Sequence, residues 1–137
     1  MSTDNQPVLL TIDDEYGMRA VIMGAAEMEG YVVHEAGSKT EIFHALNSPQ
    51  IDVIVLDVSM PDMDGIEVIW ELVRRESKAK LIILSGFEAS VIDAAMEIAQ
   101  RSGLNVVACM TKPVDITKLR EVLAQSRSNH PTIDEAA

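Results

Sequence analysis

Short apolar segments alternate with amphipathic segments along the whole chain, and this alternation limits the fold more than any other feature of the sequence. The apolar segments are typical of buried strands and predict strands over residues 7–12, 31–36, 51–57, 80–85 and 105–110. The segments that follow them have apolar residues three and four positions apart, as on one face of a helix. They predict helices over residues 16–30, 38–47, 65–76, 88–103 and 115–126. Because strands that alternate with helices form parallel sheets, we expect an α/β fold with helices on both faces of a five-stranded parallel sheet.

Several residues mark the ends of the predicted helices. Ser38 and Glu41 have the spacing of a capping box, in which two side chains satisfy free amides at the start of a helix. Asp115 is well placed to cap the last helix, and Gly30 and Gly103 are good helix stops. On the helix predicted over 65–76, the residues expected to face the sheet are Ile66, Ile69, Trp70 and Val73.

The length of 137 residues is the usual size of one domain, and 47% hydrophobic residues are enough for one sizeable core. We expect a domain over residues 7–126, a tail over 1–6, and a second tail or the start of a linker over 127–137. No apolar run reaches the ~20 residues that cross a bilayer, and the N-terminus lacks the features of a signal peptide. The expected location is therefore the cytoplasm, without membrane association.

The formal net charge of −11 argues against direct nucleic-acid binding, because a phosphate backbone would be repelled. The same charge is compatible with a cation site, although most acidic residues of such a chain serve only to keep the surface soluble. The single Cys109 supports neither an internal disulfide nor a cysteine-based metal cluster.

Residues with chemically useful side chains stand at the ends of four predicted strands, and they are Asp13 and Asp14, Asp57, Ser85, and Lys112. Because ligands of open α/β sheets bind outside the carboxyl ends of the strands, we expect these side chains to meet at one edge. Clustered carboxylates repel each other unless a cation is present, and such a cluster suits Mg²⁺. Asp57 can then act as a nucleophile, while Lys112 and Ser85 contact a phosphoryl group. Taken singly, the acid pair also fits a helix N-cap, and each of the others fits an ordinary turn or strand end.

Four motifs in this order resemble the receiver domain of bacterial two-component response regulators, the CheY-like family: "TIDDE", "VLDVSMPDMDG", "ILSG" and "TKP". The resemblance covers residues 7–126 and implies a flavodoxin-like sheet with strand order 2-1-3-4-5. It implies a signalling switch, not an enzyme with an external substrate. Asp57 would accept a phosphoryl group from a sensor histidine kinase or a histidine phosphotransfer protein in a Mg²⁺-dependent reaction.

The resemblance also implies roles for the residues around Asp57. Asp13, Asp57 and the backbone carbonyl of Ser59 would bind Mg²⁺, or Mn²⁺ in its place, with Asp14 acting through a metal-bound water. Ser85 and Lys112 would contact the phosphoryl oxygens. The Lys112–Pro113 peptide bond would be cis, which suits a tight turn that aims the lysine.

One position near the site departs from the family's common pattern, and two others adjust its chemistry. The family often has an aromatic switch residue three positions before the lysine, where this chain has Cys109, which we expect to be a small buried strand residue. The switch would then run mainly through Ser85 and the following loop, or Phe87 would take the aromatic role. In the family, the positions of Ser59 and Phe87 tune the lifetime of the phosphoryl group.

Two other classes of function stay open at this level. A Mg²⁺-dependent phosphohydrolase with an aspartyl nucleophile usually carries a second aspartate two residues after the first, where this chain has Ser59. An interaction module that is never phosphorylated usually lacks one of the acids or the lysine, and this chain keeps them. An output domain or a homodimer would use the face formed by helix 88–103, strand 105–110 and helix 115–126.

Overall fold

The five predicted strands form one sheet in the computed structural model, which describes residues 6–48, 50–60, 65–86 and 89–128. The strands are β1 (Val8–Ile12), β2 (Val32–Ala36), β3 (Val53–Asp57), β4 (Lys80–Ser85) and β5 (Asn105–Thr111). Their order in the sheet is β2-β1-β3-β4-β5, and every neighbouring pair is parallel. The expected doubly wound sheet and its strand order are therefore confirmed.

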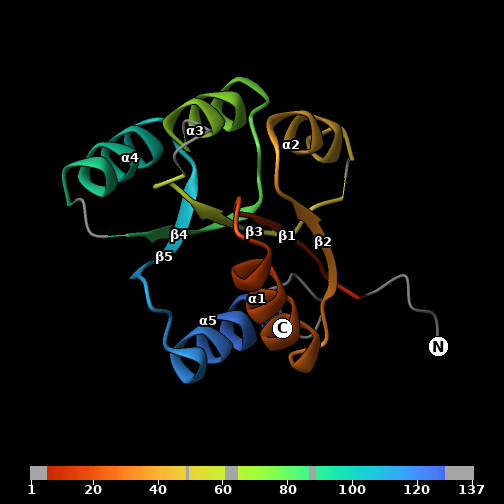
Figure 1. Cartoon of the computed structure of the whole chain (residues 1–137). Helices are drawn as coiled ribbons and strands as arrows, with labels where there is room; N and C mark the ends of the chain where they lie inside the picture. The colour runs from red at the N-terminus through yellow and green to blue at the C-terminus, as the bar shows by residue number, and fades with distance from the viewer. Residues whose placement is uncertain (1–5, 49, 61–64, 87–88, 129–137) are drawn as a thin grey trace, which may run out of the picture.

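Five helices cover the two faces of this sheet. They are α1 (Tyr16–Met28), α2 (Lys39–Leu46), α3 (Gly65–Arg74), α4 (Ala89–Arg101) and α5 (Ile116–Ser128). Figure 1 shows α1 and α5 on one face and α2, α3 and α4 on the other. Among the described residues, no helix combines the length and the apolar character that crossing a bilayer requires.

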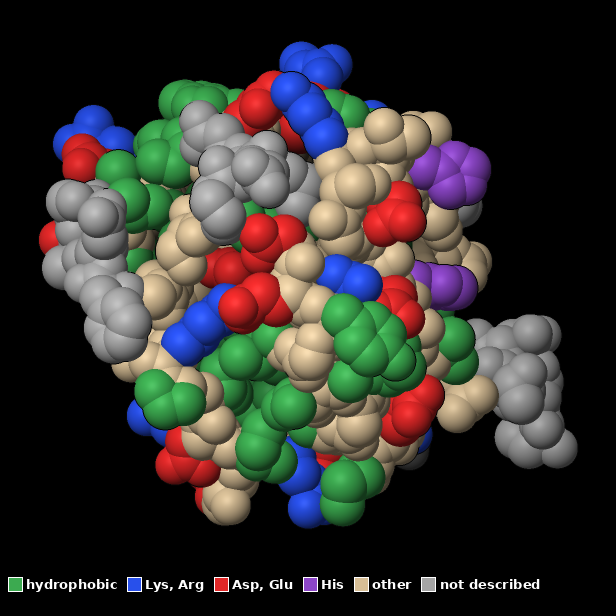
Figure 2. Space-filling model, viewed as in Figure 1, with side chains coloured by type: hydrophobic (Ala, Val, Ile, Leu, Met, Phe, Trp, Pro, Cys, Tyr) green, Lys and Arg blue, Asp and Glu red, His purple; other side chains and the backbone are tan. Residues whose placement is uncertain are grey.

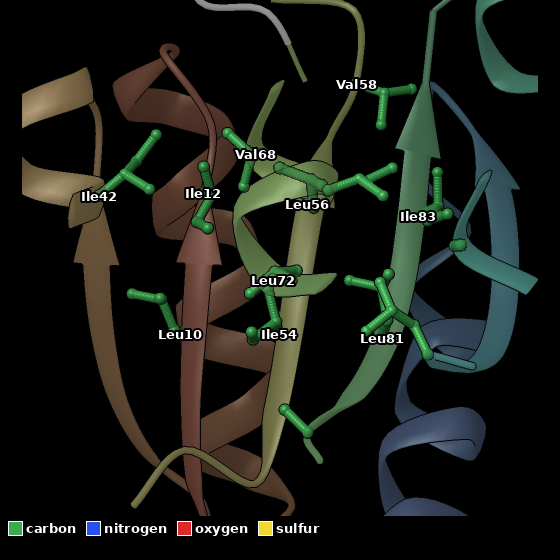
Figure 3. Packing of buried hydrophobic residues seen from close by; sticks show 14 of the residues in the cluster. Leu10, Ile12, Ile42, Ile54, Leu56, Val58, Val68, Leu72, Leu81 and Ile83 are labelled. Carbon is green, nitrogen blue, oxygen red and sulfur yellow. The ribbon is translucent and has the colours of Figure 1, made fainter. Parts of the chain in front are cut away.

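The three central strands bury their side chains on both faces, which sets the register that positions the site. On the face of α2, α3 and α4, two rows of buried residues cross the sheet (Figure 3): Leu10–Ile54–Leu81 and Ile12–Leu56–Ile83. Fully burying an aliphatic side chain of this size contributes about 1.5–3 kcal/mol. A slip of one residue would turn these side chains to the opposite face, so the register is strongly specified. It places Asp57, the residue after Leu56, beside Leu84 of β4.

The two edge strands are only partly covered by helices. On β2, Val32, His34 and Glu35 are exposed, and on β5 every second residue from Asn105 to Thr111 is exposed. A register shift opposite Leu81 and Ile82 interrupts the pairing of β4 with β5. Helices cover both faces of the sheet, as expected, and the exposed strand residues lie mainly on its two edge strands.

The predicted helix caps are present. The Ser38 side chain accepts a hydrogen bond from the Glu41 amide at 3.2 Å, and the Glu41 carboxylate accepts one from the Gly37 amide at 2.7 Å. Asp115 accepts a hydrogen bond from the Lys118 amide at 3.2 Å and so caps α5. The two glycine stops both have positive φ, at 90° and 86°, and they are Gly30 and Gly103.

The inward face of α3 differs from the prediction. Trp70 is 51% exposed, so its assignment to the buried face was wrong, and the buried stripe runs through Gly65, Val68, Ile69 and Leu72. These positions are three, one and three residues apart, so they share one face of the helix, as the predicted positions would. A Cβ on Gly65 would lie only 2.5 Å from the Cα of Val58. Glycine therefore lets α3 begin directly against the backbone that leaves β3, next to Asp57.

Candidate functional site

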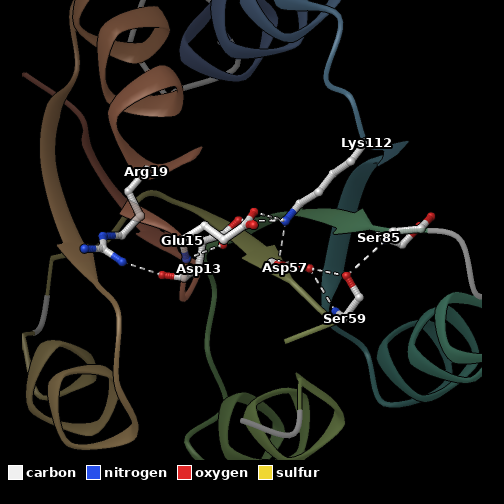
Figure 4. A network of polar contacts seen from close by, with 8 residues as sticks. Asp13, Glu15, Arg19, Asp57, Ser59, Ser85 and Lys112 are labelled. Carbon is white, nitrogen blue, oxygen red and sulfur yellow. Dashed lines mark hydrogen bonds and ion pairs between the residues drawn. The ribbon is translucent and has the colours of Figure 1, made fainter. Parts of the chain in front are cut away.

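The last residue of β3 and the residue after β5 form an ion pair at the carboxyl edge of the sheet (Figure 4). The Lys112 Nζ donates to Asp57 Oδ2 at 2.8 Å. Asp57 is 1% exposed, whereas the Lys112 side chain is 18% exposed and reaches in from the rim. The Lys112 amide also donates to the Ser85 carbonyl at 2.8 Å, which ties the end of β5 to the end of β4. Parallel strands thus bring an acid and an amine that are 55 residues apart in the sequence into direct contact.

Asp13, which follows β1, is the most constrained acid of this site. It is 1% exposed, and its Oδ1 accepts a hydrogen bond from the Glu15 amide at 2.9 Å. Its Oδ2 lies 3.2 Å from Lys112 Nζ but has no hydrogen-bond partner among the described residues. Burial raises the pKa of Asp13 above its ordinary value, and the charge of Asp57 adds to this rise against the opposing effect of the Glu15 amide and Lys112. A buried carboxylate oxygen that accepts no hydrogen bond is costly, and the one ammonium beside Asp13 is shared with Asp57 and Glu15.

Lys112 is the cation that this structure provides for the acidic cluster. Its Nζ lies 2.8 Å from Asp57, 3.2 Å from Asp13 and 3.5 Å from Glu15. Burial alone would lower the pKa of Lys112, but the hydrogen bond to Asp57 and the charges of Asp57 and Asp13 raise it above its ordinary value. The lysine therefore stays protonated and offers a fixed positive charge between the acids.

The acids also fit a divalent cation. Asp13, Asp14 and Asp57 each offer one carboxylate oxygen, and these oxygens lie within 4.8 Å of one another. Oxygen ligands from one or two carboxylates, completed by waters, are what Mg²⁺ prefers. Asp13 Oδ2 supports the same assignment, because it accepts no hydrogen bond among the described residues and shares the Lys112 ammonium with Asp57, so a second cation would stabilise it. The residues present thus fit Mg²⁺ by donor type and by the unmet need for charge.

Ser59 connects Asp57 to the segment that follows β4. The Ser59 amide and the Ser59 hydroxyl both donate to Asp57 Oδ1, at 2.8 and 2.7 Å. The Ser59 Oγ also accepts a hydrogen bond from the Gly86 amide at 3.0 Å. These contacts hold the carboxylate in one orientation. Sequence reasoning named Ser59 for its backbone carbonyl and as a position that tunes the phosphoryl lifetime, but it did not predict that the hydroxyl contacts Asp57 and Gly86.

Ser85 lies at the same edge but makes no direct contact with Asp57 among the described residues. It is 2% exposed, and its hydroxyl has only a long contact of 3.4 Å with the Gly86 carbonyl. Figure 4 shows Ser85 on the side of Ser59 away from Asp13. A hydroxyl with so weak a bond is available to another partner.

Arg19 supports the site and was not identified from the sequence. Its Nη1 donates to the Asp13 carbonyl at 2.8 Å, and its Nε donates to Glu35 at 2.8 Å. A Cβ on Gly37 would lie 2.4 Å from the same Nη1, so the glycine leaves the space that the guanidinium occupies. Arg19 therefore fixes the backbone that carries Asp13. The arginine is one helical turn into α1, and its partner on β2 is distant in sequence, so no local pattern marks it.

The two proposed switch positions have different outcomes. Cys109 is exposed on the edge strand β5, so the expectation of a buried cysteine was wrong. The error arose because the edge strand presents alternate residues to solvent, although the sequence from Val106 to Met110 is continuously apolar.

Phe87, the other proposed switch residue, lies outside the described residues. The peptide bond between Lys112 and Pro113 is cis, as the resemblance implied.

The sequence of this chain is similar to proteins that are already known. The sequence matches the family described as response regulator receiver domain over residues 9–124. It is 26% identical to sporulation initiation phosphotransferase F of Bacillus subtilis (strain 168) over 116 residues, which are 84% of this chain and 89% of that protein. It is 30% identical to transcriptional regulatory protein GlrR of Escherichia coli (strain K12) over 128 residues, which are 93% of this chain and 28% of that protein.

Solved structures show the same fold. A response regulator from Colwellia psychrerythraea has a TM-score of 0.79 and 30% sequence identity, with 91% of this chain and 99% of that chain covered. The Francisella response regulator 1452 receiver domain has a TM-score of 0.74 and 26% identity. The relatives differ in length, because the chain spans only 24% of regulatory protein AtoC of Escherichia coli (strain K12) but 89% of the Bacillus subtilis phosphotransferase.

Proposed function

Because this chain belongs to the family of response regulator receiver domains, we propose that it is a phosphorylation-controlled switch whose phosphoacceptor is Asp57. The observation that carries the proposal is the convergence on one carboxylate of a lysine, a serine hydroxyl and two further acids. The Lys112 and Ser59 contacts hold the Asp57 carboxylate in one orientation at the end of β3. Phosphoryl transfer needs positioning and charge neutralisation above all, and this edge of the sheet offers both.

The transfer that we propose is a displacement at phosphorus. A carboxylate oxygen of Asp57 forms a bond to the phosphorus of a phosphohistidine, and the phosphorus–nitrogen bond breaks. The electron pair of that bond leaves with the imidazole nitrogen of the donor. The unmodified carboxylate of Asp57 is regained by hydrolysis. Water attacks the phosphorus, the bond from phosphorus to the Asp57 oxygen breaks, and inorganic phosphate is released. The chain would thus catalyse only its own phosphorylation and dephosphorylation.

The residues around Asp57 have distinct roles in this proposal. Asp13 and Asp57 would hold Mg²⁺ with the Ser59 carbonyl, and Asp14 would act through a bound water. The metal would supply positive charge next to the transferred group. Lys112 would exchange its contact with Asp57 for a phosphoryl oxygen, because its ammonium already lies within hydrogen-bond distance of the acceptor.

The proposed switch uses the segment after β4. Ser85 is buried and weakly bonded, so a phosphoryl oxygen near Asp57 would offer its hydroxyl a stronger, charged acceptor. A shift of Ser85 towards Asp57 would pull the β4–α4 segment and bias the face formed by α4, β5 and α5. That face is the proposed surface for an output domain or for a second copy of the chain.

The proposed donor is a sensor histidine kinase or a histidine phosphotransfer protein. Some relatives carry kinase names, such as the sensor kinase CckA of Brucella abortus (strain 2308). Helix α1 follows the site acids directly. It exposes Tyr16, its first residue, at 74%, and further along the helix it exposes Val21 at 45% and Met28, its last residue, at 65%. Figure 2 shows hydrophobic side chains on this face, next to the acidic and basic side chains of the site. An apolar surface beside the acceptor suits a donor that must approach Asp57 closely.

Incubation with acetyl phosphate and Mg²⁺, followed by intact mass over time, tests the proposal. The expected result is one added phosphoryl group on the wild-type chain, none on Asp57→Asn, and wild-type uptake by Asp93→Asn, in which an exposed acid of α4 changes in the same way. Continuous turnover of acetyl phosphate without an accumulated adduct would instead favour a phosphohydrolase. No adduct and no turnover would favour an interaction module.

A further inference from the structure

Arg19 joins the residue that follows β1 to the neighbouring strand β2. Its Nη1 donates to the Asp13 carbonyl at 2.8 Å (Figure 4), and its Nε donates to the Glu35 carboxylate at 2.8 Å. The Arg19 side chain is 16% exposed, so most of it is removed from solvent. A guanidinium is planar and rigid and offers several donors at once, which lets one side chain make both contacts. The side chain therefore binds the Asp13 backbone from a fixed direction.

Three hydrogen bonds hold Asp13 in place. Its amide donates to the Ala36 carbonyl at 3.2 Å, its Oδ1 accepts from the Glu15 amide at 2.9 Å, and its carbonyl accepts from Arg19. Of these three bonds, only the one from Arg19 is made by the side chain of another residue. The Asp13 Oδ2, which a cation would stabilise, accepts no hydrogen bond among the described residues. Its direction therefore depends on how the rest of the residue is held, and Arg19 contributes to that.

Gly37 provides the space for the guanidinium. A Cβ at this position would lie 2.4 Å from Arg19 Nη1 and 2.9 Å from Arg19 Cζ, and its three nearest atoms all belong to this side chain. Gly37 does not have a positive φ, so its backbone accepts an alanine. The methyl group of Gly37→Ala would thus displace the guanidinium, which is the end of a flexible side chain, without a close contact to the backbone.

We infer that Arg19 is a positioning residue of the cation site, which strengthens Mg²⁺ binding by holding the backbone of Asp13 from the space that Gly37 leaves. This inference rests on the proposed role of Asp13 and Asp57 as ligands of Mg²⁺. Groups that orient a metal ligand without touching the metal commonly change its affinity. Glu35 has a part in the same arrangement, because its carboxylate compensates the charge of the guanidinium, which would otherwise repel the cation.

A purely structural Arg19 would only fasten α1 to β2. The chain offers a matched contact for comparison, because Arg120 Nε donates to Glu29 at 2.7 Å and thereby joins α5 to the end of α1. Of the two arginines, Arg19 is the one that also binds a residue of the proposed cation site. Loss of either arginine should lower the stability of the fold by a similar amount, whereas only the loss of Arg19 should change Mg²⁺ binding.

Mg²⁺ titrations of the full chain, followed by the shifts of backbone amide signals, test the inference. In Arg19→Met we expect the dissociation constant for Mg²⁺ to rise about tenfold, the lower end of what the loss of such an orienting group costs. Gly37→Ala should also raise this constant, although it keeps the arginine. The double variant should bind Mg²⁺ no more weakly than Arg19→Met, because both changes act through one contact. Arg120→Met should keep the wild-type dissociation constant.

The outcomes separate this inference from the proposed function. An unchanged Mg²⁺ affinity in Arg19→Met would overturn the positioning role, and so would an equal loss of affinity in Arg120→Met. Additive losses in the double variant would overturn the part assigned to Gly37. A wild-type chain that binds no Mg²⁺ would overturn the inference as a whole. If Arg19→Met binds Mg²⁺ more weakly but the wild-type chain acquires no phosphoryl group, the positioning role stands and the phosphoacceptor role of Asp57 fails.

Discussion

Two buried acids of this protein, Asp13 in the site and Glu71 on α3, differ in how their charge is compensated. The Glu71 side chain is 8% exposed and accepts from Arg75 Nε at 2.6 Å and from Arg74 Nη2. The Asp13 side chain is 1% exposed, and one of its oxygens has no hydrogen-bond partner among the described residues. The hydrogen bond from Arg75 lowers the pKa of Glu71 against the effect of burial, whereas burial raises that of Asp13.

The contrast separates structure from function. Arg75 also donates to the Leu46 carbonyl and to Asn47, so the Glu71 cluster fastens α3 to the end of α2 and is complete without a ligand. In the Asp13 cluster, which we call incomplete, Lys112 alone faces three acids, Asp13, Glu15 and Asp57, among the described residues. A protein keeps such an unfavourable arrangement where binding or catalysis needs it. The incomplete cluster is therefore the one that we assign to cation binding and phosphoryl transfer.

The largest expected effect is at the complete cluster. Glu71→Ala leaves two arginines without their buried partner and should lower the free energy of unfolding by about 3 kcal/mol. Urea unfolding followed by circular dichroism measures this change. Glu67→Ala is the matched control on the same helix, because its ion pair with Lys39 is about half exposed and is worth at most about 1 kcal/mol. Equal losses of stability in the two variants would show that the Glu71 cluster contributes no more to the fold than an exposed ion pair does.

The incomplete cluster should respond in the opposite direction. Asp13→Asn keeps the contact with the Glu15 amide but removes a buried charge that Asp57 repels, so it should raise the free energy of unfolding without Mg²⁺ by about 1 kcal/mol. We expect Mg²⁺ to raise the melting temperature of the wild-type chain, and the same change should abolish this rise. Thermal unfolding with Mg²⁺ and with a chelator measures both. A variant that is less stable than wild type without the metal would place Asp13 in the same class as Glu71.

An effect of similar size is expected two residues before Asp13. The Thr11 hydroxyl is buried on β1 and has no hydrogen-bond partner among the described residues. Thr11→Val replaces it by a methyl group of the same shape and should raise the free energy of unfolding by about 1 kcal/mol. The response to Mg²⁺ should not change. A changed Mg²⁺ response would show that the unsatisfied polar groups of β1 act together.

The smallest effect concerns pH. Because the pKa of Glu71 is lower in the folded chain than in the unfolded one, its ion pairs stabilise the fold above the unfolded pKa, and this contribution is lost as the pH falls through the folded pKa. Glu71→Gln should therefore show a weaker loss of stability between neutral and acidic pH than wild type. The free energy of unfolding measured at several pH values tests this. An identical acid dependence in both proteins would mean that the arginines do not hold Glu71 as a charged group.

The sequence was informative where local patterns and topology act together. The alternation of strands and helices fixes a parallel sheet, and the carboxyl ends of parallel strands must share an edge, so the meeting of Asp13, Asp57 and Lys112 follows from topology. Trp70 and Cys109 could not be placed in this way. Apolar residues allow more than one inward face on a helix, and an edge strand exposes residues that its composition alone would bury.

Contacts that depend on side-chain orientation also escaped sequence reasoning. Arg19 meets the Asp13 carbonyl across the gap that Gly37 leaves, and the Ser59 hydroxyl meets both Asp57 and Gly86. Arg19 also binds Glu35, 16 residues away, and Ser59 binds Gly86, 27 residues away, so each side chain links a nearby residue to a segment that only the folded sheet brings close. The acids of the site can be recognised from strand ends, whereas the groups that orient them require coordinates.

Peptide mass spectrometry of the chain after reaction with acetyl phosphate is the most direct test of the account, performed once with Mg²⁺ and once with a chelator. We predict a single phosphoryl group, located on the peptide that contains Asp57, and its absence when the metal is removed. A phosphoryl group on another residue, or equal uptake on Asp57 without a divalent cation, would contradict the assignment of the incomplete acidic cluster to metal-dependent phosphoryl transfer.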